Sequence, residues 1–186
     1  CPPVDCAPDP EQVIANIAQA TQAIVAAGAM PVVLGGEHTV TFGVIEGMLR
    51  AGVDNLGVVQ IDAHADLRDA YEGDPLSHAS VMRRIVDRGV PLYQLGIRAF
   101  CEEERAAREH YGVRFQDAEE LVVRGLSAIA LPDDFPDNVF FTLDIDGVEK
   151  QWGDWYPPSS LGSIKGGDSN VFTYWRHDFI EYNREH

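Results

Sequence analysis

Apolar runs of strand length alternate with helix-like segments along most of this chain, and this alternation restricts the folds open to it. Strands are expected at 30–34, 56–61, 92–97, 112–115 and 139–145, and helices at 9–27, 39–50, 78–88, 102–110 and 117–124. Strands that alternate with helices at this spacing form a mainly parallel sheet with helices on both faces. The sequence therefore predicts an α/β fold, a three-layer α/β/α sandwich.

Acidic residues and histidines follow three of the expected strands. They are His38 after the first, Asp62, His64 and Asp66 after the second, and Asp144 and Asp146 at the end of the last. In a parallel sheet, ligand sites form outside the carboxyl ends of the strands. Because residues i, i+2 and i+4 of an extended segment point to one side, we expect the three side chains in 62–66 to converge on one site.

These six side chains have the chemistry of a divalent metal centre. Two imidazoles and four carboxylates suit hard-to-borderline ions, with Mn²⁺ the natural choice. Six side chains exceed the four that one tetrahedral zinc uses. Two ions about 3.5–4 Å apart can share a water molecule and lower its pKa. On its own, the 62–66 stretch could equally be loop carboxylates that cap a helix, but its combination with the other strand ends favours metal binding.

Length, charge and cysteine content limit the classes of partner. The 186 residues fit one domain, residues 1–149, and the segment 150–186 is not expected to form a second one. The net charge of −16 argues against nucleic acid and fits a small cationic substrate, although solubility alone is an equal explanation. An odd number of cysteines without a CxxC pair favours a cytoplasmic setting. No apolar run approaches the roughly 20 residues that span a membrane.

The motifs resemble those of the ureohydrolase family, the arginases and agmatinases. GGEHT at 35–39, DAHAD at 62–66 and LDIDGVE at 143–149 are similar to three elements of that family, and the stretch 66–85 looks most like bacterial and archaeal agmatinases. The resemblance covers about residues 9–149. It implies an arginase-like fold, incomplete at both ends, in a homo-oligomer that cleaves agmatine to putrescine and urea. Such an incomplete sheet would expose strand edges and self-associate.

The resemblance also implies a role for each site residue. One Mn²⁺ ion would be held by His38, Asp62, Asp66 and Asp144, and a second by Asp62, His64, Asp144 and Asp146. Hydroxide bound to the two ions would attack the guanidinium carbon, while Asp66 orients it and relays a proton. His78 matches the active-site histidine of the family and would shuttle protons. From the residues alone, His78 could instead belong to a helix start that is capped by Ser77.

The chain departs from the family pattern after residue 149. Glu149 and Lys150 replace the usual Asp and Pro, and the aromatic-rich segment 151–186 contains all three tryptophans. No counterpart of the glutamate that holds the guanidinium is identified, so the substrate-binding residues stay unassigned. Three alternatives therefore remain open: a truncated or non-catalytic metal-binding remnant, an arginase or other guanidino-acid ureohydrolase, and a deacetylase-like zinc hydrolase with a single metal.

Overall fold

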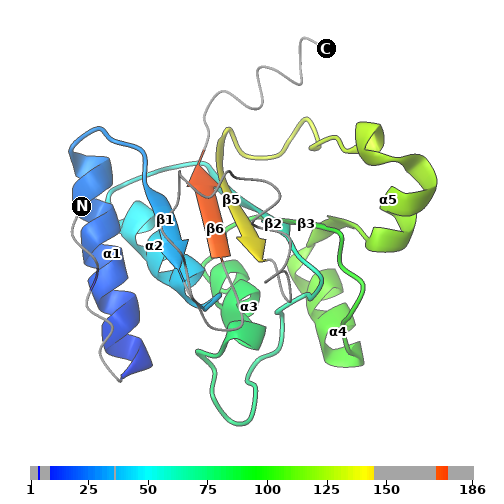
Figure 1. Ribbon diagram of the computed structural model, residues 1–186, viewed down its shortest axis with the longest axis horizontal. Helices are drawn as coiled ribbons and strands as arrows, with labels where there is room; N and C mark the ends of the chain where they lie inside the picture. Colours follow the sequence, from blue (N-terminus) through cyan, green and yellow to red (C-terminus); the bar gives the residue numbers. More distant parts are fainter. Residues whose placement is uncertain (1–3, 5–8, 36, 145–170, 176–186) are drawn as a thin grey trace, which may run out of the picture.

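The computed structural model describes residue 4, residues 9–35 and 37–144, and the backbone of 171–175. The helices are α1 (Pro10–Ala26), α2 (Val40–Arg50), α3 (Val81–Val86), α4 (Glu102–Tyr111) and α5 (Ala118–Arg124), with short 3₁₀ helices η1 (His78–Ser80) and η2 (Leu126–Ala128). The strands are β1 (Val32–Gly35), β2 (Leu56–Ile61), β3 (Leu92–Leu95), β4 (Arg114–Gln116), β5 (Asn138–Asp144) and β6 (Val171–Trp175). Figure 1 shows the helices arranged around a central sheet.

The described strands form one mainly parallel sheet in the order β1-β6-β5-β2-β3-β4. Strand β2 pairs in parallel with β3 and β5, and β3 pairs in parallel with β4, whereas β6 is antiparallel to both of its neighbours. The chain runs outward from β2 to β4 and then returns to β5 on the other side of β2. The carboxyl ends of β2 and β5 therefore flank a topological switch point, which is where ligands bind in such sheets.

Two apolar layers cover the two faces of the sheet. On one face, Val58, Leu92 and Phe140 pack in a core with residues from α1 to α4. On the other face, Val59, Tyr93 and Val139 pack with Phe135 and with residues of the segment after η2. The α/β fold class expected from the alternation of strands and helices is thereby confirmed. None of the helices in the described ranges has the length and hydropathy that crossing a bilayer requires.

Close packing of α1 on α2 fixes the helix that begins next to His38. Helix α1 starts with Asp9 as its N-cap, whose side chain accepts a hydrogen bond from the backbone N–H of Glu11. A Cβ atom built on Gly47 of α2 would lie 2.5 Å from the backbone oxygen of Ala18 in α1. Glycine therefore lets the two helix backbones approach more closely than a larger residue would allow.

Two expected elements differ from the structure, and one strand was not expected. The expected helix at 78–88 is a 3₁₀ turn, η1, capped by Ser77, followed by the short α3, because Ser80 at their junction has non-helical dihedral angles (φ −121°, ψ 1°). The strand expected to be buried at 30–34 is β1, whose Val32 and Leu34 are 60% and 65% exposed because they point away from the helical layer. Strand β6 was not expected from the sequence at all.

Candidate metal centre

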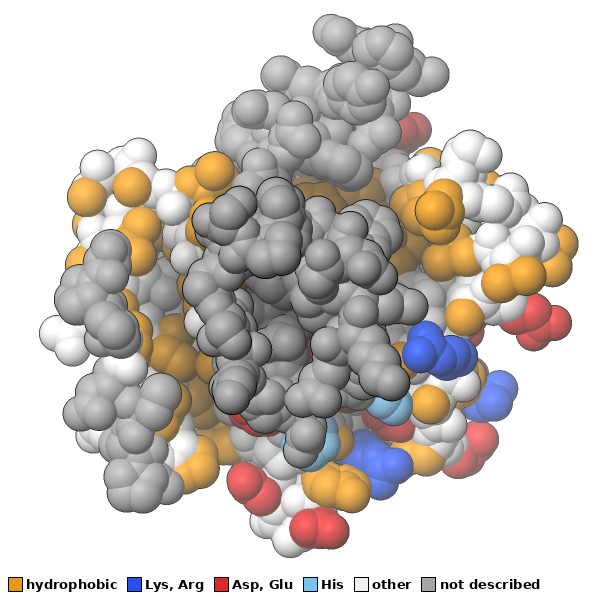
Figure 2. Space-filling model, in the orientation of Figure 1, with side chains coloured by type: hydrophobic (Ala, Val, Ile, Leu, Met, Phe, Trp, Pro, Cys, Tyr) orange, Lys and Arg blue, Asp and Glu red, His pale blue; other side chains and the backbone are white. Residues whose placement is uncertain are grey.

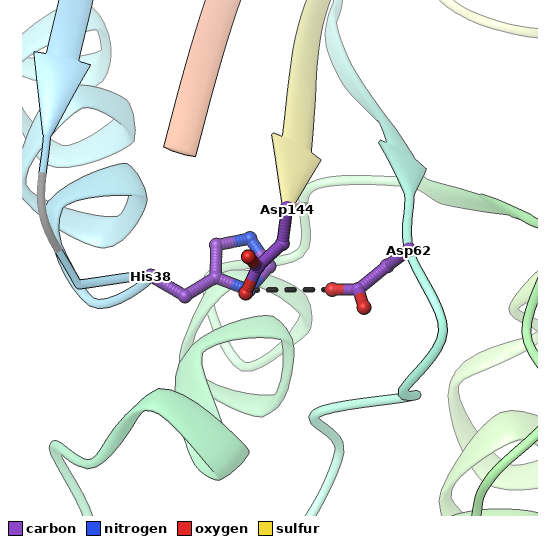
Figure 3. A group of neighbouring side chains, drawn as sticks. All are labelled: His38, Asp62 and Asp144. Carbon is purple, nitrogen blue, oxygen red and sulfur yellow. Dashed lines mark ion pairs between the residues drawn. The ribbon is translucent and has the colours of Figure 1, made fainter. Parts of the chain in front are cut away.

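A buried imidazole lies at the centre of the candidate site. His38, just before α2, is fully buried, and its Nδ1 lies 2.7 Å from Oδ2 of Asp66. The same nitrogen lies 3.5 Å from Oδ2 of Asp62, after β2, and 3.6 Å from Oδ2 of Asp144, at the end of β5. Figure 3 shows His38, Asp62 and Asp144 pointing toward one another from three separate segments. In Figure 2, the visible histidine side chains and several acidic side chains lie in the lower half of the view.

The second ring nitrogen of His38 determines how the first can act. Nε2 lies 3.0 Å from Oγ1 of Thr142, and this oxygen is 3.0 Å from Oγ1 of Thr41. When Nε2 carries the proton and donates a hydrogen bond to Oγ1 of Thr142, Nδ1 presents a lone pair to the three carboxyl groups. A histidine ligand is commonly fixed in this way, by a hydrogen bond from its other nitrogen.

The 62–66 loop reaches the site by bending rather than by extending. Residues 62 and 63 form a bend, and Asp66 has a φ of 53°, in the left-handed region. The expectation of an extended segment was therefore wrong, because this turn, and not a two-residue period, returns Asp66 to His38. A non-glycine residue with positive φ is uncommon, and such strain concentrates at functional sites.

Burial makes two of the carboxyl groups weak acids. Burial raises the pKa of Asp62 to about 6, and the neighbouring charge of Asp66 adds to the shift. Burial raises the pKa of Asp66 to about 8, and the charge of Asp144 adds to it, whereas His64 opposes the shift. Both effects disfavour the ionised carboxylates, so a cation at this place would offset the repulsion between them.

The residues present fit a divalent metal ion. One ligand atom each from His38, Asp62 and Asp144 lies within 4.8 Å of the others. Oδ2 of Asp66 adds a third carboxylate oxygen beside the same imidazole nitrogen. One imidazole nitrogen with three carboxylate oxygens is a donor set that suits Mn²⁺.

The remaining predicted site residues lie at the border of this cluster or outside the described ranges. His64 has a half-exposed side chain, and its Nδ1 lies 3.8 Å from Oδ1 of Asp62. His78 is exposed at the rim, where its Nδ1 lies 3.8 Å from Oε1 of Glu37 and its ring meets the edge of Tyr71. Asp146 lies outside the described residues, as do Glu149 and Lys150. A cavity of about 370 Å³ next to His78 is lined by Glu37 and by apolar residues of α1, and by none of the clustered ligands.

Two supporting residues were missed in the sequence. Gln60 and Thr142 are buried polar residues in β2 and β5, and they are aligned in the register of the two strands. Each precedes a ligand aspartate by two positions, so each lies on the same face of its strand as that ligand. A polar residue at this position in an otherwise apolar run is the signal that could have identified both.

Comparisons with known proteins identify the family of the chain. A family model described as "Arginase family" matches residues 1–152. An N(1)-aminopropylagmatine ureohydrolase from Synechocystis sp. is 36% identical over 66% of this chain and 40% of its own length. An agmatinase from Bacillus subtilis is 34% identical over 76% of this chain and 48% of its own length. The crystal structure of agmatine ureohydrolase from Thermoplasma volcanium matches with a TM-score of 0.61 and 28% identity, over 74% of this chain and 46% of that one. The chain therefore spans less than half the length of these relatives.

Proposed function

Because this chain belongs to the arginase family, we propose that it is a ureohydrolase that cleaves a guanidino group. The proposed reaction is the hydrolysis of agmatine to putrescine and urea. The observation that carries the proposal is the convergence of His38, Asp62, Asp66 and Asp144 at the switch point of the sheet. The free thiol of Cys101 is compatible with a cytoplasmic setting, which we include in the proposal.

The proposed centre holds two Mn²⁺ ions. One would be held by His38, Asp62, Asp66 and Asp144, and the other by Asp62, His64, Asp144 and Asp146. When bound, such ions lower the pKa of water and so supply a nucleophile near neutral pH. The bent 62–66 loop supports this assignment, since it carries three of the proposed ligands. Asp62 accepts a hydrogen bond from the His64 N–H, and Asp66 is hydrogen-bonded to His38.

Two side chains are proposed to handle protons. Asp66 is buried against His38, with Oδ2 2.7 Å from Nδ1 of that residue, and is proposed to relay a proton to the leaving amine. His78 is exposed at the rim beside Glu37, where it can exchange protons with water. Burial is the main cause of the raised pKa of Asp66, and the charge of His78 opposes this shift. The position of His78 is suited to a proton shuttle between water and the buried site.

The proposed substrate is a small linear guanidino compound that carries a positive charge. The net charge of −16 favours the approach of cations. Two relatives bear the names agmatinase and N(1)-aminopropylagmatine ureohydrolase, which makes agmatine and its aminopropyl derivative the first compounds to test. Arginine belongs in the same comparison, since no guanidinium-binding residue is assigned among the described residues.

A second candidate is a metal-binding protein without catalysis. It is favoured by one observation, namely that no guanidinium-binding residue is assigned among the described residues. The two candidates share the metal centre and differ only in turnover. They are therefore distinguished by an assay that measures metal binding and urea release on the same sample.

The test measures Mn²⁺ binding by calorimetry and urea release from agmatine, N(1)-aminopropylagmatine and arginine. We expect urea from agmatine or its derivative, and a loss of more than about 100-fold in rate in His38→Asn, because this variant removes a proposed ligand. The control is His110→Asn, which changes an exposed histidine of α4 and should leave the rate unchanged. Mn²⁺ binding without urea release from any of the three compounds would favour the non-catalytic candidate.

A further inference from the structure

A buried chain of hydrogen bonds connects the 62–66 loop to β2, β3 and α4. We propose that Gln60, Gln94 and Arg108 are positioning residues for the metal centre: a one-way chain of N–H donors that holds Asp62 and the 62–66 loop in their metal-binding geometry. We call these three residues the donor chain. The proposal rests on the proposed metal centre, and it concerns residues that do not themselves contact a metal ion or substrate.

The first member of the donor chain holds the ligand loop directly. Gln60, in β2, is fully buried, and its Nε2 donates to Oδ2 of Asp62 at 2.9 Å and to the backbone oxygen of His64 at 3.0 Å. The other oxygen of Asp62, Oδ1, accepts the backbone N–H of His64 at 2.9 Å. Both oxygens of Asp62 are thus oriented by donors from within its own segment, which fixes the carboxylate plane.

The second and third members lie progressively further from the site. Gln94, in β3, is paired in register with Gln60, and its Nε2 donates to Oε1 of Gln60 and to the backbone oxygen of Ala65, both at 2.7 Å. Arg108, in α4, donates from Nε to Oε1 of Gln94 at 2.8 Å. The donor chain therefore touches the ligand loop at Asp62, His64 and Ala65, through two different side-chain amides.

The direction of the donor chain follows from chemistry. A guanidinium group has N–H donors and no acceptor, so Arg108 can face only the oxygen of the Gln94 amide. The nitrogen of Gln94 then faces the oxygen of Gln60, and the nitrogen of Gln60 faces the carboxylate of Asp62. The backbone oxygens of His64 and Ala65 accept from the same two nitrogens, so they independently require the same amide orientations.

Arg108 is anchored as the fixed end of this chain. Its side chain is buried, and NH1 and NH2 donate to the two carboxylate oxygens of Asp117 at 3.1 and 2.9 Å. The guanidinium carbon also lies 4.3 Å from the ring centroid of Phe115 and 4.7 Å from that of Phe100. Ring stacking and a bidentate ion pair hold a guanidinium in one orientation more firmly than a single hydrogen bond.

The donor chain offsets the main obstacle to building this site. Asp62, Asp66 and Asp144 crowd three acidic groups around one imidazole, so their ionised forms repel one another in the absence of a cation. N–H groups directed at Asp62 oppose this repulsion and keep the ligand oxygens in place before a metal arrives. Loss of a side chain that hydrogen-bonds to a metal ligand typically lowers metal affinity by about 10- to 100-fold.

The experiment measures Mn²⁺ affinity by calorimetry in Gln60→Leu, Gln94→Leu and Arg108→Met. We expect affinity to fall by about 10- to 100-fold in the two glutamine variants and by a smaller factor in Arg108→Met, since the effect passes through two amides. Arg108→Lys keeps a cationic donor and should restore part of the affinity. The matched control is Gln116→Leu, because Gln116 is a buried glutamine of β4 whose side chain bonds to Tyr93 and Ala128 instead.

A second readout follows the donor chain without metal. In the ¹⁵N spectrum, the side-chain amide protons of Gln60 should exchange slowly with water, and Arg108→Met should shift them although Arg108 does not contact Gln60. Unchanged Mn²⁺ affinity in Gln94→Leu, or an unmoved Gln60 amide in Arg108→Met, would overturn the proposal. Affinity losses in a chain that releases no urea would support the donor chain and contradict only the proposed activity. A wild-type chain that binds no Mn²⁺ would overturn both.

Discussion

Asp66 combines two unfavourable features in one residue. Its φ of 53° lies in a region where only short polar residues and glycine are readily found. Burial raises the pKa of its carboxyl to about 8, with the charge of Asp144 as a second cause. Asparagine would tolerate the backbone conformation as well as aspartate does, so Asp66→Asn removes the ionisable group without adding backbone strain.

The first prediction concerns the pH dependence of stability in the metal-free chain. The folded-state pKa of Asp66, about 8, lies above its unfolded value of 3.8, so the folded state binds more protons between these pH values. The stability from this group is fully present below about pH 4 and is lost as pH rises through about 8, with a slope of at most about 1.4 kcal/mol per pH unit. Asp62, raised by burial to a pKa of about 6, acts in the same direction.

Thermal melts of metal-free protein across this pH range provide the measurement. The melting temperature should fall with rising pH in the wild type, less steeply in Asp66→Asn, and least of all with saturating Mn²⁺. Asp54→Asn is the control, since it removes one exposed negative charge elsewhere. An Asp66→Asn variant with the wild-type slope would contradict the assignment of this effect to Asp66.

At the scale of elements, the packing of α1 on α2 yields the second prediction. Gly47→Ala should destabilise the fold, although alanine is intrinsically the better helix former by about 1 kcal/mol. The added Cβ would lie 2.5 Å from the backbone oxygen of Ala18 and 2.6 Å from Cβ of Thr21. Because overpacking of this kind costs about 1–3 kcal/mol, and the helix propensity of alanine offsets about 1 kcal/mol, we expect a net loss of up to about 2 kcal/mol.

Urea denaturation of Gly47→Ala and wild type measures this difference. The control variant is Arg50→Ala, an exposed change at the end of the same helix, which should alter the free energy of unfolding by less than about 0.5 kcal/mol. If Gly47→Ala were more stable than wild type, the two helices would have to be further apart than the structure shows.

The elements also show what sequence patterns can and cannot predict. Strand β2 and helix α2 were predicted because each is a clear run bounded by turn residues. Strand β6 was missed because its five residues have no partner nearby in the chain; their pairing is determined by β1 and β5. The convergence of His38, Asp62 and Asp144 follows from the parallel sheet and was predicted, but the second metal position depends on Asp146, outside the described ranges. The donor chain was missed because residue spacing does not reveal hydrogen bonds between β3 and α4.

On the scale of the whole molecule, exposed apolar residues yield the third prediction. Val122, Val123 and Leu126, on α5 and η2, are 75–84% exposed, and Phe115 of the neighbouring β4 is 46% exposed. Figure 1 shows α5 projecting from one end of the sheet. Exposed apolar groups of this kind, beside a strand at the edge of the described sheet, favour association. We therefore expect the isolated chain to self-associate, as the resemblance to the ureohydrolase family also implies.

Sedimentation velocity over a series of concentrations tests this prediction. The double variant Val122→Lys/Val123→Lys should shift the distribution toward monomer, whereas Ala106→Lys, on the exposed side of α4, should leave it unchanged. A wild-type chain that sediments as a monomer throughout the series would argue against association through α5.

The parallel pairing of β5 with β2 has a consequence for the order of events in folding. His38 meets Thr142 across a separation of 104 residues, and Asp144 follows two positions later. Contacts that close such long segments form late, after more local structure has been ordered. A cation held by the complete cluster would then stabilise interactions that are absent from the folding nucleus. It would therefore slow unfolding and leave the folding rate unchanged. The metal would thus bind after the sheet has formed and would hold the native state kinetically.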